Sequence, residues 1–158
     1  MDREFQIFVK PVGAACNLRC SYCYYLDKSS LYTESGRSLM SDDVLEKYII
    51  QHIEASTDKV IMFSWHGGEP TLAGMDFYRK AVTLQKKHLP AGFKLINGIQ
   101  TNGTLLDDDW CRFLSDQNFL VGISIDGPEK FHDKYRTGPD GKAAFARVMK
   151  GYELLTKY

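Results

Sequence analysis

Two kinds of hydrophobic pattern alternate along the chain. Four short runs rich in apolar residues have the length of strands, and apolar residues at helical spacing follow them. The predicted strands cover residues 5–12, 60–65, 93–101 and 119–125. The second run has the sequence VIMFSW and is apolar apart from Ser64, which favours a strand that is covered on both faces.

Polar residues indicate where the intervening helices begin. Ser41 precedes two aspartates and predicts an N-cap, because a serine oxygen accepts hydrogen bonds from free backbone N–H groups and acidic residues favour the first turn. Asp76 and Asp107 are predicted to cap the next two helices in the same way.

The rest of the pattern completes four strand–helix units. A short turn over residues 128–135 is predicted to lead to a last helix, whose apolar residues recur at helical spacing over 145–155. Residues 28–39 are the longest candidate loop. Strand–helix units in series predict an α/β fold with a parallel sheet and helical crossovers.

Polar segments follow each predicted strand. They cover residues 16–23, 66–70, 100–103 and 124–128. Because the carboxyl ends of parallel strands lie at one edge of a sheet and ligands bind there, these four segments predict a single site.

Composition and charge narrow the class of protein. The chain has 158 residues with 44% hydrophobic and 25% charged residues, which indicates one globular domain or part of one. Its formal net charge of zero gives no electrostatic reason to expect nucleic acid or an acidic membrane as a partner. No apolar run has the length of a membrane helix or a signal peptide, so we expect a cytoplasmic location.

Three of the four cysteines, Cys16, Cys20 and Cys23, form the pattern C-x3-C-x2-C. In a reducing compartment such a group favours a metal site over disulfides. Three thiolates hold three corners of a [4Fe–4S] cluster and leave the fourth iron without a protein ligand, as a catalytic metal needs. Zinc bound by these cysteines and a distant His or Asp is the less favoured alternative. Cys111, which stands alone, is expected to pack as a small hydrophobic residue.

The segment 16–23, CNLRCSYC, resembles the C-x3-C-x-aromatic-C signature of the radical S-adenosylmethionine (SAM) enzymes. Together with WHGGEP at 65–70, QTNG at 100–103 and SIDG at 124–127, it resembles the anaerobic sulfatase-maturating enzymes and related enzymes that act on peptides. The resemblance implies that residues 1–158 are a radical SAM core domain with the N-terminal four strand–helix units of a partial (β/α)6 barrel. The remaining barrel and a C-terminal domain with auxiliary clusters would lie outside this chain.

The resemblance also implies a reaction. S-adenosylmethionine would chelate the open iron, and an electron from the cluster would cleave the carbon–sulfur bond of S-adenosylmethionine. The resulting 5′-deoxyadenosyl radical would take a hydrogen atom from the substrate. The substrate would be a Cys or Ser of a sulfatase, oxidised to Cα-formylglycine, and the electron donor a ferredoxin or flavodoxin. Two alternatives are another peptide-modifying radical enzyme, such as one forming thioether crosslinks, and a non-catalytic zinc-binding α/β module.

Four residues match cofactor contacts of that family. Tyr22 would lie against the adenine, Gly68 would meet the methionine ammonium, Ser124 would contact the methionine group and Arg136 would bind its carboxylate. Without the resemblance, each has an ordinary reading: a core aromatic, a turn glycine, a strand-end cap and a solvated charge.

Two further residues, Tyr25 and His66, are possible contacts for the peptide because they flank the predicted cofactor site. The resemblance implies that the residue taking the substrate proton lies beyond Tyr158, so the catalytic residue is unknown and the chain by itself would be inactive. The fourth strand would present an open apolar edge, which predicts self-association.

Overall fold

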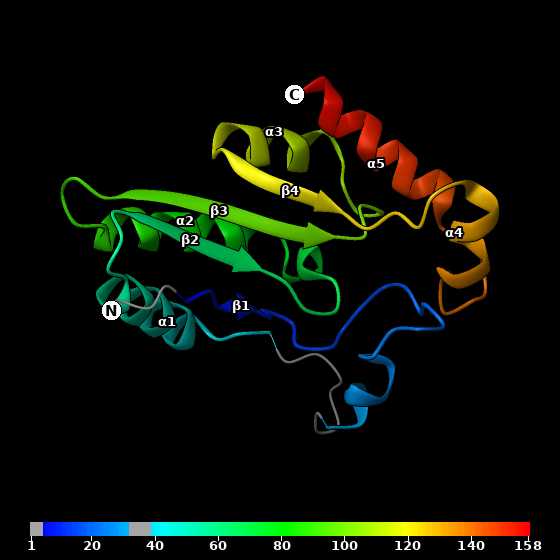
Figure 1. The fold of residues 1–158 in the computed structure, drawn as a ribbon, viewed down its shortest axis with the longest axis horizontal. Coiled ribbons are helices and arrows are strands. Elements are labelled where there is room, and N and C mark those ends of the chain that lie inside the picture. The colour runs from blue at the N-terminus through cyan, green and yellow to red at the C-terminus, as the bar shows by residue number, and fades with distance from the viewer. Residues whose placement is uncertain (1–4, 32–38) are drawn as a thin grey trace.

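The computed structural model describes residues 5–31 and 39–158. It contains a sheet of four parallel strands in the order β1-β2-β3-β4 (Figure 1). The strands are β1 (Phe8–Val9), β2 (Val60–Trp65), β3 (Lys94–Thr101) and β4 (Phe119–Ile123). The α/β prediction is confirmed, although the first strand is much shorter than residues 5–12.

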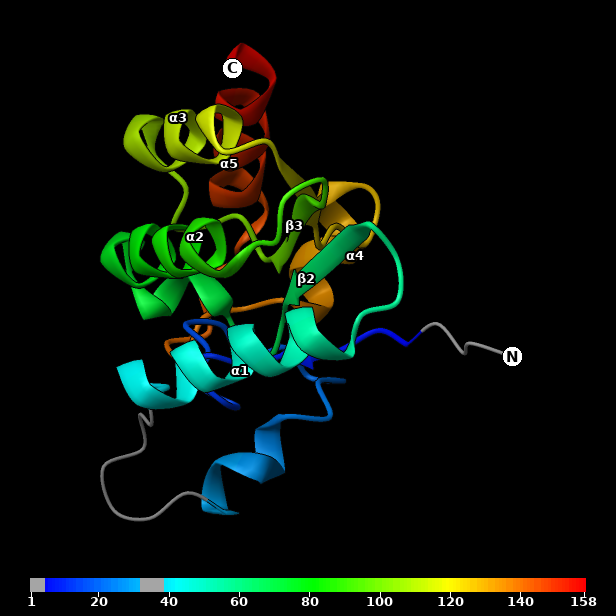
Figure 2. The ribbon, with the colours of Figure 1, turned by 90° about the vertical axis from the view of Figure 1, so that its left-hand side faces the viewer.

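Helices connect the strands on one side of the sheet. Figure 2 shows the first three helices on the same face of β2 and β3. The helices are α1 (Asp42–Ala55), α2 (Met75–His88), α3 (Asp108–Asp116), α4 (Glu129–Tyr135) and α5 (Phe145–Lys157), with 3-10 turns at η1 (Leu26–Leu31) and η2 (Pro70–Ala73). Residues 128–135, predicted as a turn, are therefore mostly helical, and part of the predicted loop 28–39 lies outside the described residues.

Two of the three predicted helix caps are confirmed. Ser41 Oγ accepts a hydrogen bond from Val44 N at 3.4 Å, and Asp107 Oδ1 accepts from Trp110 N at 2.8 Å. The prediction for Asp76 is wrong, because α2 already begins at Met75 with Gly74 as its cap. The acidic side chain instead lies in the first turn, where it favours the helix through the macrodipole.

The main core lies between the sheet and α1–α3. Phe63, Trp65 and Ile99 point from the strands into this layer, where Tyr78 of α2 is fully buried. Cys111 is 1% exposed in the same cluster, which confirms its prediction as a small packing residue. Alternate strand residues reach the helices because side chains of a strand point to opposite faces in turn.

The opposite face of the sheet stays open in the described part of the chain. Val60 and Met62 are 50% and 37% exposed, so the prediction that β2 is covered on both faces does not hold here. Leu120 of the edge strand β4 is 57% exposed. Among the described residues, no helix has the length and apolar character needed to cross a membrane.

Candidate functional site

The four polar segments meet at the carboxyl ends of the strands, as predicted. The segment after β2 is held by the loop that precedes the cysteines: Gly68 N donates to Gly13 O at 3.0 Å, and Glu69 N donates to Ala15 O at 2.8 Å. Ser124 N, after β4, donates to the carbonyl of Thr101 in β3 at 2.9 Å. In Figure 1 these segments lie at or beyond the strand arrowheads.

The loop 16–23 brings the three cysteines to one side of this edge. Cys20 is buried against Leu18 and Val148, and the partly buried Cys16 and Cys23 pack against the same cluster. All are free thiols. Cys16 and Cys23 also line a cavity of about 390 Å³ that opens beside the loop.

Backbone hydrogen bonds fix the cysteine loop to the segment after α4. Arg19 N donates to Thr137 O at 2.7 Å, and Ser21 N donates to Tyr135 O at 2.9 Å. The start of the loop is thus held by the segment after β2, and its middle by the end of α4, although these elements are far apart in sequence.

The donor set of this loop fits an iron–sulfur cluster. Burial raises the pKa of Cys16 to about 11 and also raises the pKa of Cys20, and the nearby thiols add to both shifts. Metal binding would therefore have to displace protons from these thiols. Among the described residues, no three His, Cys, Asp or Glu side chains already surround one point as the ligands of a single ion do. A [4Fe–4S] cluster attaches each of its cysteines to a different iron, and three free thiols on one loop supply ligands of the required kind.

Glu69 joins the end of β2 to the end of β3. Its carboxylate is fully buried and accepts hydrogen bonds at 2.6–3.1 Å from the Thr71 hydroxyl and N–H, from the Thr101 hydroxyl and from Asn102 N. Four donors compensate for removing this charge from water. The carboxylate therefore has a structural role at the centre of the site.

A ring of three side chains lies next to Cys16. Asn102 Nδ2 donates to Asn17 Oδ1 at 2.8 Å, Asn17 Nδ2 donates to Thr104 Oγ1 at 2.8 Å, and Thr104 Oγ1 donates to Asn102 Oδ1 at 2.7 Å. The Thr104 backbone N–H also donates to Asn102 Oδ1 at 2.9 Å, and this donor determines which end of each amide is nitrogen.

Gly68 packs against the loop before the cysteines. A Cβ at this position would overlap Ala15 O and lie 2.5 Å from Ala14 O, so no side chain fits without moving backbone. This close approach gives the glycine a packing role. Its contact with the methionine ammonium stays a prediction.

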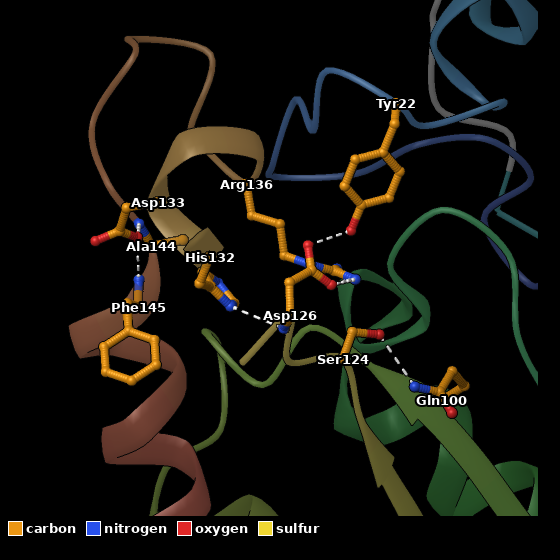
Figure 3. A network of polar contacts seen from close by, with 9 residues as sticks. All are labelled: Tyr22, Gln100, Ser124, Asp126, His132, Asp133, Arg136, Ala144 and Phe145. Carbon is orange, nitrogen blue, oxygen red and sulfur yellow. Dashed lines mark hydrogen bonds and ion pairs between the residues drawn. The ribbon is translucent and has the colours of Figure 1, made fainter. Parts of the chain in front are cut away.

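Tyr22, Asp126 and Arg136 form one network (Figure 3). Tyr22 donates its hydroxyl hydrogen to Asp126 Oδ2 at 2.5 Å, and Arg136 Nη2 donates to Asp126 Oδ1 at 3.0 Å. The guanidinium also lies 5.6 Å from the centre of the Tyr22 ring. Partial burial of the hydroxyl and its bond to Asp126 raise the pKa of Tyr22 to about 12. In this structure both predicted cofactor residues thus have a protein partner, and their contacts with the cofactor stay predictions.

Ser124 is the fourth predicted cofactor residue. Its hydroxyl accepts a hydrogen bond from Gln100 Nε2 at 3.0 Å (Figure 3). Gly122 makes room for this contact, because a Cβ there would overlap the Gln100 side-chain oxygen. Ser124 and Gln100 bring the ends of β4 and β3 together on the open face.

The two possible peptide contacts, Tyr25 and His66, have different surroundings. Tyr25 is buried and lines the cavity with Cys16 and Cys23, and Lys10 Nζ lies 5.0 Å from the centre of its ring. His66 N donates to Val9 O, and its ring packs edge-on against Phe8. Burial, together with the charge of Lys10, lowers the pKa of His66.

The residue that takes the substrate proton is expected to follow Tyr158 in the sequence. Tyr158 itself does not belong to the site. It follows α5, and its hydroxyl donates to Asp108 Oδ1 of α3 at 2.8 Å. Its carbonyl accepts a hydrogen bond from the Ser115 hydroxyl at 3.2 Å. Tyr158 therefore joins α5 to α3 on the helical side of the sheet, and the position of the proton acceptor stays a prediction.

Three site residues were not singled out from the sequence: Glu69, Asn102 and Asp126. Each belongs to a segment that the sequence placed at a strand end, and that position was the available signal. Their partners in other segments could not be read from the pattern, because the pattern is local to each segment.

These features define a class of protein: a parallel α/β domain that carries a three-thiol loop at the carboxyl edge of its sheet. A family model described as the Radical SAM superfamily matches residues 11–158. The chain therefore belongs to the radical SAM superfamily, and this membership implies a [4Fe–4S] cluster and S-adenosylmethionine as its cofactors.

The most informative relatives mature sulfatases. The chain is 52% identical over 156 residues to a serine-type anaerobic sulfatase-maturating enzyme of Bacteroides thetaiotaomicron, covering 99% of this chain and 37% of the relative. It is 40% identical over 152 residues to a cysteine-type enzyme of Clostridium perfringens, covering 96% and 41%. The chain thus spans about two fifths of the length of these relatives.

A solved structure agrees with the fold. Native anSMEcpe with bound AdoMet and Cp18Cys peptide aligns with a TM-score of 0.86 and 39% identity, over 96% of this chain and 40% of that chain. The same enzyme with bound AdoMet alone aligns with a TM-score of 0.86 and 40% identity. These matches confirm the predicted four-unit portion of a radical SAM enzyme.

Proposed function

We propose that this chain is the cofactor-binding core of an anaerobic sulfatase-maturating enzyme. The whole protein would oxidise a Cys or Ser of a sulfatase polypeptide to Cα-formylglycine, with a ferredoxin or flavodoxin as the electron donor, in the cytoplasm. The observation that carries the proposal is that the three-thiol loop lies next to the segments after β2, β3 and β4. The chain is also 52% identical to such an enzyme over 156 residues.

Different residues of the chain would bind the cluster and the S-adenosylmethionine. Cys16, Cys20 and Cys23 would hold the cluster, whose chemistry, with S-adenosylmethionine bound, is one-electron reduction that generates a 5′-deoxyadenosyl radical. Gly68 and the end of β2 would receive the methionine group of the cofactor. These assignments are supported by the closeness of the two loops, which share backbone hydrogen bonds.

The other cofactor residues would act from the opposite side. Ser124 would contact the methionine group from the end of β4, Arg136 would pair with its carboxylate, and Tyr22 would cover the adenine with its half-exposed ring. Arg136 and Tyr22 would then exchange part of their contact with Asp126 for the cofactor. Tyr25 and His66 would lie near the peptide, and Tyr25 lines the cavity beside the cysteine loop.

The test uses the protein reconstituted anaerobically with iron and sulfide. We expect a brown protein with about four irons per chain, and S-adenosylmethionine should change the electron paramagnetic resonance spectrum of the reduced cluster. A colourless protein that binds zinc instead would contradict the cluster and support the zinc module.

The activity is tested on the whole protein with two sulfatase peptides that differ only in Cys or Ser at the target position. Reaction with a hydrazide-type aldehyde probe, together with 5′-deoxyadenosine release, would support formylglycine formation. A product that lacks an aldehyde and contains an internal thioether would instead support the crosslinking alternative.

A further inference from the structure

We propose that Asn102 is a positioning residue that donates an N–H hydrogen bond to the sulfur of Cys16 and thereby raises the reduction potential of the cluster. The inference rests on the proposed role of the three cysteines as cluster ligands. It adds a determinant of the potential that lies at the end of β3, outside the cysteine loop.

The first observation is the position of the amide. Asn102 Nδ2 lies 3.8 Å from Cys16 Sγ, within the longer reach of a sulfur acceptor, and Leu18 N approaches the same sulfur at 3.4 Å. Asn102 is 6% exposed, so water competes little for its amide hydrogens. A thiol sulfur is a weak acceptor, whereas a thiolate bound to iron is charged and accepts more strongly.

The second observation is that the amide cannot turn away. Its oxygen accepts from Thr104 N at 2.9 Å and from the Thr104 hydroxyl at 2.7 Å, while one of its N–H groups is used by Asn17 Oδ1 at 2.8 Å. The remaining N–H is left for the sulfur. A flipped amide would place nitrogen against the Thr104 N–H, which also donates.

The third observation is that the backbone of Asn102 is fixed. Its N–H donates to the fully buried carboxylate of Glu69 at 2.7 Å, and Glu69 also accepts from the neighbouring Thr101 hydroxyl. The buried carboxylate after β2 therefore positions the end of β3, and the end of β3 positions the donor at Cys16.

The physical consequence concerns the added electron. Reduction makes the cluster and its thiolates more negative, so a fixed donor at a ligand sulfur stabilises the reduced form more than the oxidised form. Loss of that donor should move the potential to a more negative value and make the cluster harder to reduce.

The experiment is a redox titration of the cluster-loaded protein without S-adenosylmethionine, followed by electron paramagnetic resonance. Asn102→Ala should lower the potential, since it lacks the side-chain N–H. Asn102→Asp keeps the oxygen that Thr104 needs and should lower the potential further, because its carboxylate adds negative charge beside the sulfur. Gln100→Ala is the matched control: it removes an amide from the same end of β3, but this amide donates to Ser124. Its potential should equal that of the unmodified protein.

A measurement on the unmodified sequence keeps the inference testable where the variants fail to fold or to bind iron. Protein labelled with ¹⁵N at asparagine should show hyperfine coupling of a side-chain nitrogen to the reduced cluster. Absence of this coupling, or an equal potential in the Asn102 variants that do bind iron, would overturn the inference. A protein that binds no cluster at all would instead overturn the ligand assignment.

Discussion

The guanidinium of Arg136 faces the carboxylate of Asp126, with Nη2 3.0 Å from Oδ1 and Nε 3.0 Å from Oδ2. Both side chains are largely buried, and they join the end of α4 to the segment after β4. Tyr22 binds the same carboxylate from the cysteine loop. Three segments distant in sequence thus depend on one acidic residue.

Asp126→Asn should therefore destabilise the fold. The change removes the charge that faces a largely buried guanidinium and weakens two hydrogen bonds, so we expect a loss on the order of 1–3 kcal/mol in the free energy of unfolding. Urea unfolding of the two proteins measures it. Asp140→Asn is the control, because its ion pair with Lys142 is exposed and should contribute little. Equal losses in both variants would contradict a special role for Asp126.

The same pair predicts an acid dependence. Burial by itself would raise the pKa of Asp126, but the hydrogen bonds and charge of Arg136 and the bond from Tyr22 outweigh it and hold the pKa below its usual value. A carboxylate with a lowered folded-state pKa stabilises the fold above its unfolded pKa of about 3.9. This stabilisation is lost as the pH falls through the lower, folded-state pKa. The difference in unfolding free energy between the unmodified protein and Asp126→Asn should be constant near neutrality and shrink below about pH 4; an unchanged difference in acid would contradict it.

Replacing any one of Cys16, Cys20 or Cys23 by Ala should abolish the visible absorbance of the reconstituted cluster, because Ala offers iron no ligand. Cys111→Ala is the control, because it makes the same Cys-to-Ala change at a residue of the core between the sheet and the helices. This variant should keep the absorbance. It should cost only about 1 kcal/mol of stability, through a small cavity. Iron analysis and absorbance spectra of the four variants check this, and loss of the cluster in Cys111→Ala would refute the three-ligand assignment.

Gly68→Ala should destabilise the protein by about 1–3 kcal/mol, because the new Cβ would overlap the carbonyls of Ala14 and Ala15. Gly98→Ala is the control: it lies in β3, and its Cβ would meet only Leu120 O at an ordinary 3.9 Å. That change should be neutral or slightly stabilising. Thermal unfolding compares the two, and equal melting temperatures would show that the loops do not need this close approach.

The 158-residue chain should self-associate through the edge of β4, where Leu120 is more than half exposed. Leu120→Lys should reduce the association, since a charge on an edge strand opposes pairing with another chain. Val44→Lys is the control, because Val44 is similarly exposed on α1, away from that edge. Light scattering measures the mass in each case. A monomer at all concentrations, or an equal effect of both variants, would refute the role of this edge.

The sequence by itself determined most of the elements and the position of the four polar segments at the strand ends. Apolar runs predicted β2, with bounds that agree residue for residue, and Ser41 and Asp107 marked the starts of α1 and α3. These signals are local, because a strand period or a cap depends on neighbours within a few residues. The cysteine spacing is local as well, and it led to the correct family.

The tertiary structure alone decided which polar residues meet. Glu69 accepts hydrogen bonds from Thr101 and Asn102, and the Asn102 amide reaches the sulfur of Cys16. Asp126 accepts hydrogen bonds from Arg136 and Tyr22. These partners are 10 to 104 residues apart in sequence. The same holds for Gly68, which resembles a turn glycine in the sequence but is required by the backbone of another loop. Such pairings depend on strand order and register, which bring distant segments to one edge of the sheet, and no pattern within a single segment contains that information.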